Sequence, residues 1–202
     1  MKKVYLTRHG QSMWNVENKI CGATDIGLTE RGHAQAQAAG KDIAAALRGE
    51  MFPLLPQNMK IDEILYSPLS RAAQTARHIS EQTGIPMRAE ERLREQNFGK
   101  YEGTARNGAE FQAAKAQFVN SYGGGESMMR LAQRIYNLLD EIFHEPEEKN
   151  YLLVAHNGIA RIVRSYFFDM TNEEFAAFGI RNCEVVEFCF PEENSGRKKD
   201  FF

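Results

Sequence analysis

Short apolar runs alternate with longer amphipathic stretches along this chain. Residues 4–6, 61–66 and 151–155 are short, largely apolar runs that stop at polar residues, as buried strands do. The segment 183–190 is predicted as a further strand, and the residues around 85–87 as a short extended piece. Strands separated by helices predict an α/β fold, a three-layer α-β-α sandwich with a mostly parallel central sheet.

The helical stretches lie between these strands. Residues 29–47 are rich in alanine and charged side chains, and their first residue, a threonine, is a suitable N-cap. The helix predicted over 68–82 starts with a proline, which fits the first helical position. Residues 128–143 carry apolar side chains at helical spacing and predict an amphipathic helix of about five turns. Another helix is predicted over 159–168, followed by a short one.

Three segments break this pattern. Residues 49–60 carry two prolines and predict an irregular loop, which could belong to a lid or to a dimer contact. Three glycines at 123–125 are interpreted as a flexible hinge, because no G-K-[ST] follows to form a phosphate loop. The tail 194–202 is polar and is expected to be loosely held. The length of 202 residues predicts one domain over 1–202.

The composition narrows the class of protein. Hydrophobic residues make up 43% and charged residues 26%, as in soluble globular proteins. A net charge of −2 argues against a nucleic-acid partner, and no apolar stretch approaches the ~20 residues of a membrane span. The run before Arg8 is too short for the apolar region of a signal peptide, and three cysteines without a C-x-x-C pair indicate free thiols. We therefore expect a cytoplasmic protein.

Polar residues of one chemical kind follow three of the predicted strands. Arg8 and His9 follow the first, Arg71 lies shortly after the second, and His156 follows 151–155. In parallel sheets, ligands bind at the carboxyl ends of the strands. Guanidinium groups match phosphate oxygens, and a histidine can attack phosphorus. The residue chemistry therefore predicts a phosphoryl-transfer site at this edge.

Longer motifs around these residues resemble the histidine phosphatase superfamily, which has the phosphoglycerate mutase-like fold. The motifs are Thr7-Arg8-His9-Gly10, Trp14-Asn15, Leu28-Thr29-Glu30-Arg31-Gly32, Tyr66-Ser67-Pro68-Leu69-Ser70-Arg71-Ala72, Gln74-Thr75-Ala76, Leu93-Arg94-Glu95, Phe98-Gly99, Glu102-Gly103 and Val154-Ala155-His156-Asn157-Gly158. They occur in the family's order and span residues 4 to about 165, most of the chain.

The resemblance implies a role for each catalytic residue. His9 matches the nucleophile that becomes phosphohistidine, and Arg8, Arg71 and His156 match the groups that hold the transferred phosphoryl oxygens. Glu95 matches the general acid, which later activates water. Charge builds on phosphoryl and leaving-group oxygens in this step, so cationic donors and one proton source suffice. The resemblance implies no metal and no cofactor.

The expected substrate-binding set comprises Arg8, Asn15, Cys21, Gly22, Arg71, His156 and Asn157. Cys21 stands where the family more often has threonine or glutamine, and a neutral thiol is a poorer hydrogen-bond donor. Selectivity for the leaving group is expected from Met13, Trp14, Cys21 and the segment 104–123. The sequence leaves the physiological ester open, because sugar phosphates, nucleotides and phosphoglycerates present the same dianion.

Three functions are compatible with these motifs. Mutases of this family carry a long insertion after the E-G motif, whereas here 104–123 has one arginine, Arg106, and no proline. A short lid leaves a phosphohistidine open to water, so we predict a phosphatase that hydrolyses small-molecule phosphate monoesters. A 2,3-bisphosphoglycerate-dependent phosphoglycerate mutase is the alternative. A non-catalytic binding protein is a third possibility, although such relatives typically lose the nucleophile or its partners.

Simpler interpretations exist for several of these residues. Glu95 lies in a run of charged residues, which is usually a solvated surface, and Glu102 is the next carboxylate to consider as the acid. His33, His78 and His144 fall on polar helix faces and are expected to be ordinary surface residues.

Overall fold

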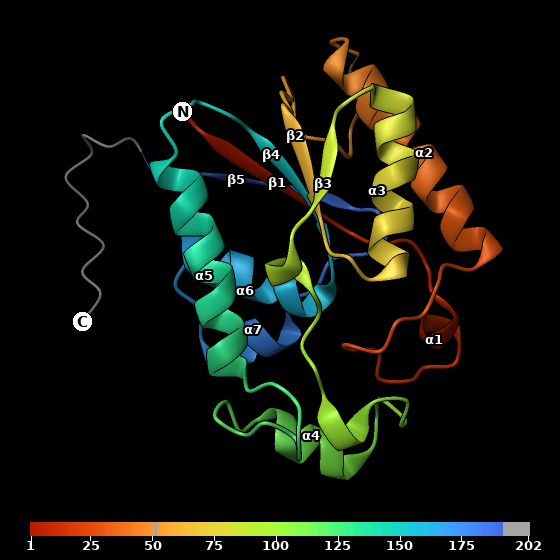
Figure 1. Cartoon of the computed structure of the whole chain (residues 1–202), viewed down its shortest axis with the longest axis vertical. Coiled ribbons are helices and arrows are strands. Elements are labelled where there is room, and N and C mark those ends of the chain that lie inside the picture. Colours follow the sequence, from red (N-terminus) through yellow and green to blue (C-terminus); the bar gives the residue numbers. More distant parts are fainter. Residues whose placement is uncertain (51, 192–202) are drawn as a thin grey trace.

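The computed structural model describes residues 1–50 and 52–191, and at its centre lies a five-stranded sheet with the order β3-β2-β4-β1-β5 (Figure 1). The strands are β1 (Lys3–Arg8), β2 (Glu63–Tyr66), β3 (Met87–Ala89), β4 (Tyr151–Ala155) and β5 (Val185–Cys189). The pairs β1–β4, β2–β4 and β2–β3 are parallel, and β5 runs antiparallel to β1 at one edge. The predicted α/β fold with a mostly parallel sheet is therefore confirmed.

Helices cover both faces of the sheet. The long helices are α2 (Glu30–Leu47) and α3 (Ser70–Thr83) on one face, and α5 (Met128–His144) and α6 (Asn157–Phe167) on the other (Figure 1). The short elements are α1 (Met13–Val16), α4 (Ala109–Lys115), α7 (Asn172–Ala177) and the 3-10 turns η1 (Glu91–Leu93) and η2 (Gly99–Tyr101). This gives the three-layer sandwich that the alternating pattern predicts.

The central strands send successive side chains to opposite faces. Val4 and Leu6 of β1 join the apolar cluster beneath α5 and α6, whereas Tyr5 joins the cluster beneath α2 and α3. In β4, Leu153 and Leu152 divide in the same way. Because both faces of these strands are covered, both sets of side chains are apolar, and the strands appear in the sequence as continuous apolar runs.

The contact between α2 and α3 corrects one prediction. A side chain at Gly40 would place its Cβ 2.9 Å from the carbonyl oxygen of His78, so the glycine permits close helix packing. At this interface His33 and His78 are half-buried, and their Nδ1 and Nε2 atoms lie 2.9 Å apart. They are therefore not ordinary surface residues, whereas His144 is exposed as predicted.

Helix α3 begins later than predicted. Its first residue is Ser70, and Pro68 lies before the N-cap, Leu69, instead of at the first helical position. The capping group comes from a distant loop, since the amide and hydroxyl of Ser70 donate to the two carboxylate oxygens of Asp25, each at 2.7 Å. The long-range cap sets the start of this helix more strongly than the proline does.

Other element boundaries also differ by a few residues. Helix α6 already begins at Asn157, with His156 as its N-cap. Strand β5 starts two residues later than predicted, because Cys183 takes a positive φ of 61° and its amide donates to the Arg8 carbonyl at 2.8 Å. The predicted tail 194–202 lies outside the described residues.

The glycines at 123–125 form a fixed turn, which contradicts their interpretation as a hinge. Gly123 and Gly124 have φ values of 66° and 100°, and a side chain at Gly125 would collide with the backbone at Asn97. The amide of Lys100 donates to the Tyr122 carbonyl at 3.0 Å, and that of Glu126 donates to the Asn97 carbonyl at 2.8 Å. These bonds fasten the turn to η2 and its neighbours.

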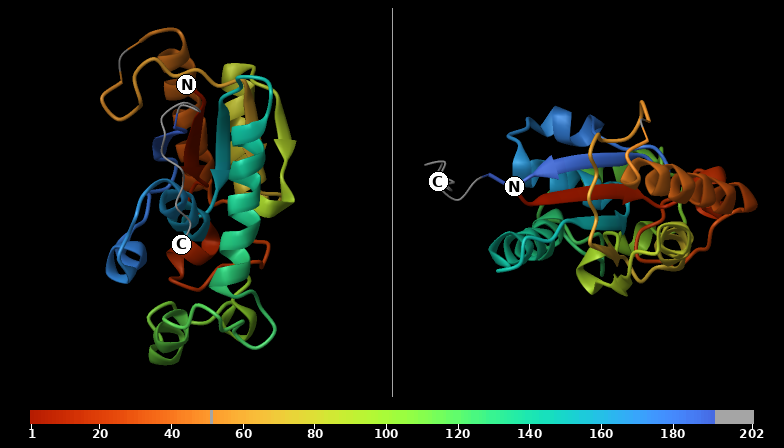
Figure 2. Two further views of the ribbon diagram at one scale, coloured as in Figure 1. Left: turned by 90° about the vertical axis from the view of Figure 1, so that its left-hand side faces the viewer. Right: turned by 90° about the horizontal axis from the view of Figure 1, so that it is seen from above.

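The described residues of the segment 49–60 lie at the end of the molecule opposite α4 (Figure 2). Residues 52–55 flank α2 and the segment 181–185 there, and none of the described residues of 49–60 lines the candidate active site. The segment is therefore not part of a lid over that site, and the dimer contact stays a prediction. Within 1–50 and 52–191, no helix combines the length and hydropathy needed to span a membrane.

Candidate active site

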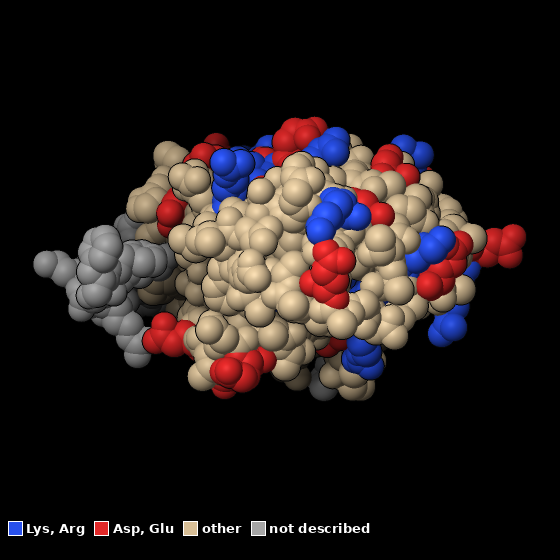
Figure 3. Space-filling model, turned by 90° about the horizontal axis from the view of Figure 1, so that it is seen from below, with Lys and Arg blue, Asp and Glu red and all other residues tan. Residues whose placement is uncertain are grey.

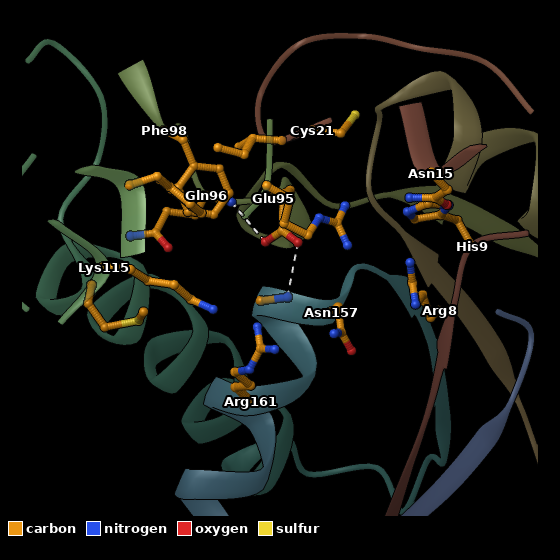
Figure 4. Close-up of a pocket in the computed structure, with 15 residues that line it drawn as sticks. Arg8, His9, Asn15, Cys21, Glu95, Gln96, Phe98, Lys115, Asn157 and Arg161 are labelled. Atoms are coloured by element: carbon orange, nitrogen blue, oxygen red, sulfur yellow. Dashed lines mark hydrogen bonds between the residues drawn. The ribbon is translucent and has the colours of Figure 1, made fainter. Parts of the chain in front are cut away.

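A pocket of about 100 Å³ opens at the carboxyl ends of β1 and β4. Its polar lining consists of Arg8, His9, Asn15, Cys21, Glu95, Gln96, Arg106, Lys115, Asn157 and Arg161 (Figure 4). Among the described residues that line it, Glu95 is the only carboxylate, beside three arginines and one lysine. A phosphate ester would therefore meet a positively charged environment.

His9 is set up as a nucleophile. Its side chain is 5% exposed, and its Nδ1 lies 2.7 Å from the Gly10 carbonyl oxygen. Because a carbonyl only accepts hydrogen bonds, the neutral ring carries its proton on Nδ1 and keeps the lone pair on Nε2. Burial, and then the charges of Arg71 and Arg8, hold the pKa of His9 well below its usual value. The ring is therefore unprotonated at neutral pH and can attack phosphorus.

The turn that carries His9 is held from several sides. Its amide donates to the Ala155 carbonyl at 3.0 Å, and its carbonyl accepts from the Asn182 side chain at 2.6 Å. The Gly10 amide donates to the Thr75 hydroxyl at 3.1 Å. No local sequence pattern points to Asn182, because it precedes β5 in an irregular segment 173 residues away from His9.

His156 packs directly beside His9, with ring centroids 5.2 Å apart. Its Nε2 lies 2.8 Å from the Ser67 hydroxyl at the end of β2. Its Nδ1 is buried and has no hydrogen-bond partner among the described residues. Burial, Arg71 and His9 keep the pKa of His156 well below its usual value. His156 thus carries one unpartnered ring nitrogen close to His9.

Arg71 is fully buried behind the two histidines. Its Nη1 and Nη2 donate to the carbonyls of Thr24 and Gly22 at 2.9 and 2.7 Å, and its Nε has no partner among the described residues. Its charge lowers the pKa values of both His9 and His156, which places it close to the reacting centre. The predicted convergence of the four strand-end residues is thus found, although Arg71 and His156 lie behind the pocket lining.

The loop at residues 22–24, whose carbonyls accept from Arg71, is also held by the carboxylate of Glu102. It accepts from the amides of Gly22, Ala23 and Thr24 at 3.1, 3.0 and 3.3 Å, and from the Phe98 amide at 2.9 Å. Glu102 is thereby committed to the loop and does not line the pocket. Since the Gly22 amide and carbonyl are both bonded within the protein, Gly22 presents no free backbone group to a substrate.

Arg8 and two asparagines line the His9 end of the pocket. Arg8 donates from Nη1 to the Ile180 carbonyl at 3.1 Å, and burial and then Arg106 lower its pKa. Asn15 accepts the Ser12 amide at 3.1 Å, and Asn157 accepts the Ile180 amide at 2.9 Å. With each amide oxygen occupied, the NH₂ groups of Asn15 and Asn157 are left as donors toward the pocket.

Glu95 is not a solvated surface residue, since its side chain is 7% exposed. Its Oε1 accepts the Gln96 amide at 2.9 Å, and its Oε2 accepts the Gly158 amide at 3.0 Å in the first turn of α6 (Figure 4). A side chain at Gly158 would overlap this carboxylate, so the glycine makes room for it. The two amides orient both carboxylate oxygens at the pocket, whereas Arg94 of the same charged run pairs with Glu91 in solvent.

The residues expected to set selectivity divide in two groups. Cys21 lines the pocket as a neutral thiol, because burial raises its pKa. Met13 is 49% exposed, and the Trp14 ring lies against Gly103, so neither lines the pocket. The lid segment does contribute, through α4.

Two cations of the lining were missed in the sequence. Arg161 lies one helical turn after Asn157, so i, i+4 spacing on α6 could have placed it on the same face. Lys115 ends α4, and no local pattern distinguishes it from a surface lysine. Among the described residues, no group of three metal-ligating side chains is positioned to hold a metal ion.

Comparisons with known proteins agree with this geometry. The model of the histidine phosphatase superfamily (branch 1) matches residues 4–197. The Yersinia pestis (strain Pestoides F) protein named probable phosphoglycerate mutase GpmB is 30% identical over 199 residues, covering 95% of this chain and 86% of that protein.

Solved structures show the same fold. Mycobacterial glucosyl-3-phosphoglycerate phosphatase, in complex with VO3, matches with a TM-score of 0.75 and 26% identity, covering 93% of this chain and 90% of that one. The alpha-ribazole phosphatase from Shigella flexneri matches with a TM-score of 0.75 and 22% identity over 94% and 91% of the two chains. These similarities support an enzyme of the phosphatase or mutase type. On the family match, the chain belongs to the histidine phosphatase superfamily.

Proposed function

We propose that this protein is a phosphatase that hydrolyses small-molecule phosphate monoesters through a phosphohistidine at His9. The observation that carries the proposal is the buried, neutral His9 ring in one pocket with Glu95, the lone carboxylate among the described lining residues. One group is suited to attack phosphorus and the other to move the proton. The pocket of about 100 Å³ is smaller than the roughly 300–1,000 Å³ usual for ligand sites and favours a compact substrate.

In the first step, the Nε2 lone pair of His9 forms a bond to phosphorus while the bond from phosphorus to the ester oxygen breaks. Arg8 and the amides of Asn15 and Asn157 supply donors to the phosphoryl oxygens, with Arg71 adding its charge from behind. The protonated carboxyl of Glu95 gives its proton to the leaving oxygen. The products of this step are a free alcohol and phosphohistidine.

In the second step, the Glu95 carboxylate takes a proton from a water molecule that attacks phosphorus. The bond between phosphorus and Nε2 breaks, and inorganic phosphate leaves with His9 restored as the neutral ring. The same carboxylate thus serves as acid and then as base, as microscopic reversibility requires of a group placed beside one reacting phosphorus.

Hydrolysis is favoured over mutase chemistry by the small lid. Between Glu102 and Met128 the covering structure consists of turns and one short helix, α4. A mutase must keep water from its phosphohistidine until a second phosphoglycerate oxygen accepts the phosphoryl group. The relative named phosphoglycerate mutase, at 30% identity, keeps mutase activity as the second candidate.

Two measurements test the proposal. After a quenched reaction with ³²P-labelled ester, we expect label that survives alkali and is lost in mild acid, absent from His9→Ala and present in the matched surface variant His144→Ala. Parallel incubations with p-nitrophenyl phosphate and with 3-phosphoglycerate, each with and without 2,3-bisphosphoglycerate, should release phosphate. Labelling of His9→Ala at the wild-type level contradicts the nucleophile, and isomerisation of phosphoglycerate that outpaces phosphate release selects the mutase.

A further inference from the structure

A second group of cations lies in the pocket on the far side of Glu95 from His9. In Figure 4 Lys115 lies on the opposite side of the Glu95 carboxylate from Arg8, His9 and Asn15, and Arg161 lies below that carboxylate. The charges of Lys115 and Arg161 interact. Burial is the first cause of the lowered pKa of Lys115, and the charge of Arg161 is the second. Both cations also sense the charge of Glu95.

The side chains of these two cations are unpaired within the described residues. Neither the Lys115 nor the Arg161 side chain makes a hydrogen bond or ion pair with any residue in 1–50 or 52–191, and the Arg161 Nε is buried without a partner. Burial is the first cause of the lowered pKa of each. Removing a cation from water without a compensating anion is unfavourable, so a structural role alone does not account for the pair.

Two other partly buried arginines of the same protein are paired with carboxylates. Arg92 pairs with Glu90 at 2.9 Å and Glu141 at 2.7 Å, and Arg134 pairs with Glu126 at 2.8 Å. The Arg164 Nε is also buried without a partner, but its guanidinium lies over the rings of Phe168 and Phe178, at 5.3 and 4.7 Å from their centroids. Among the described residues, Lys115 and Arg161 have neither a carboxylate partner nor a ring contact of this kind, and both line the pocket.

The positive charge there is also local. Figure 3 views the molecule from below, the end at which α4 lies in Figure 1, and shows acidic and basic side chains interspersed over a mainly uncharged surface. A broad basic face, which would point to a polyanion, is not visible at that end. A small anion that reaches into the pocket fits the arrangement better.

We propose that Lys115 and Arg161 form a subsite for a second anionic group, a carboxylate or a phosphate, carried by the leaving group of the substrate. This rests on the proposed function, since the first phosphate must occupy the His9 end. Glu95 then faces the ester oxygen between the two anions, which is where its proton is needed. The exposed Arg106, which also lines the pocket, adds charge at the rim.

The test measures binding without turnover. In the His9→Ala background, calorimetry gives the Kd of three ligands with the same carbon chain: glycerol 3-phosphate, 3-phosphoglycerate, and glycerol 1,3-bisphosphate. Each is measured before and after Lys115→Gln and Arg161→Gln. Lys41→Gln and Arg130→Gln, on exposed positions outside the pocket, are the matched controls.

We expect at least one of the two doubly anionic ligands to bind about tenfold or more tightly than glycerol 3-phosphate, the scale of a charged hydrogen bond. Lys115→Gln and Arg161→Gln should each remove most of this preference and change glycerol 3-phosphate binding less than about twofold. Preference for 3-phosphoglycerate identifies a carboxylate subsite, and preference for the bisphosphate identifies a phosphate subsite.

The proposal is overturned if all three ligands bind within twofold of one another, or if the two variants weaken all three equally. An equal loss in Arg130→Gln reduces the effect to general charge attraction and also overturns it. The proposed phosphatase function fails by a different result, the absence of phosphate release by the wild-type protein from any ester. The two failures are therefore distinguishable.

Discussion

The two ends of the pocket differ in how completely the protein satisfies its own polar groups. At the phosphate end, His9, His156 and Arg71 are at most 5% exposed, and each is held by hydrogen bonds within the protein. At the leaving-group end, Lys115 and Arg161 are half-buried and make no such bond with the described residues. The first arrangement is preorganised for one reaction, whereas the side chains of the second remain free to bind a ligand.

The two ends also draw on different parts of the fold, with α6 contributing to both, through Asn157 and Arg161. The phosphate end rests on the central sheet, whereas the lid is built on a separate apolar cluster of Ile20, Tyr101, Phe111, Ala114 and Tyr122. A separately packed lid can change its side chains without disturbing the strands that hold His9 and His156.

The largest expected effect follows from replacing Glu95, the carboxylate that lines the pocket. Glu95→Gln should slow hydrolysis of alkyl phosphates by about 10²–10⁴-fold, the range of general acid catalysis. Phosphorylation of His9 by p-nitrophenyl phosphate should suffer much less, because nitrophenolate leaves without a proton.

Stopped-flow measurement of nitrophenolate should then show a burst followed by slow turnover, since the variant cannot activate water. Glu91→Gln is the control, because it alters an exposed carboxylate of the same charged run. Equal slowing of both substrate types, with no burst, removes Glu95 from the proton transfer.

A second prediction concerns the preorganised end alone. Arg71→Ala should lower kcat by about 10²–10³-fold, the loss expected when one preorganised donor or charge is removed. Arg71→Lys should recover little, because an ammonium cannot reach both the Gly22 and Thr24 carbonyls as the guanidinium does. Steady-state kinetics with p-nitrophenyl phosphate measure both, and full activity of Arg71→Lys shows that charge alone matters.

A third prediction concerns the hydrogen bond that holds His156 in place. Ser67→Ala leaves the Nε2 of His156 without its partner, which should lower kcat about 10–100-fold with a smaller change in KM. Ser80→Ala is the control. It removes a hydrogen bond near the C-terminal end of α3, from the Ser80 hydroxyl to the Ile85 carbonyl at 2.7 Å, far from the pocket. A loss of stability in both variants with unchanged kcat in Ser67→Ala assigns Ser67 to folding only.

The smallest expected effect is on stability. The pKa values of His9 and His156 lie well below 6.5 in the folded protein, so the unfolded chain binds more protons as pH falls through about 6.5. By linkage, the free energy of unfolding decreases as pH is lowered, and the two histidines together should contribute about 1.4 kcal/mol between pH 7 and pH 6. Urea unfolding at both pH values measures it.

The double variant His9→Gln/His156→Gln should lose this share of the pH dependence, whereas His144→Gln, at an exposed position, should keep it. An unchanged pH dependence in the double variant means that the two rings are protonated equally in the folded and unfolded states.

Local sequence patterns predict the secondary-structure elements of this protein and the phosphate chemistry proposed for it. The apolar runs of β1 and β4 end at Arg8-His9 and at His156, and a parallel sheet brings such ends to one edge whatever the surrounding detail. The superfamily was identifiable from its motifs, because the site residues follow the end of each strand at a fixed spacing in the sequence.

Contacts between distant segments decided the rest. Asp25 caps α3 from another loop, Gly40 turns two apparent surface histidines into an interface pair, and α4 brings Lys115 beside Arg161. None of these follows from a local period or propensity, because each depends on how separately formed elements pack against one another. Local patterns thus predict the proposed site of attack on phosphate, whereas the charges proposed to surround the leaving group follow from how distant segments pack.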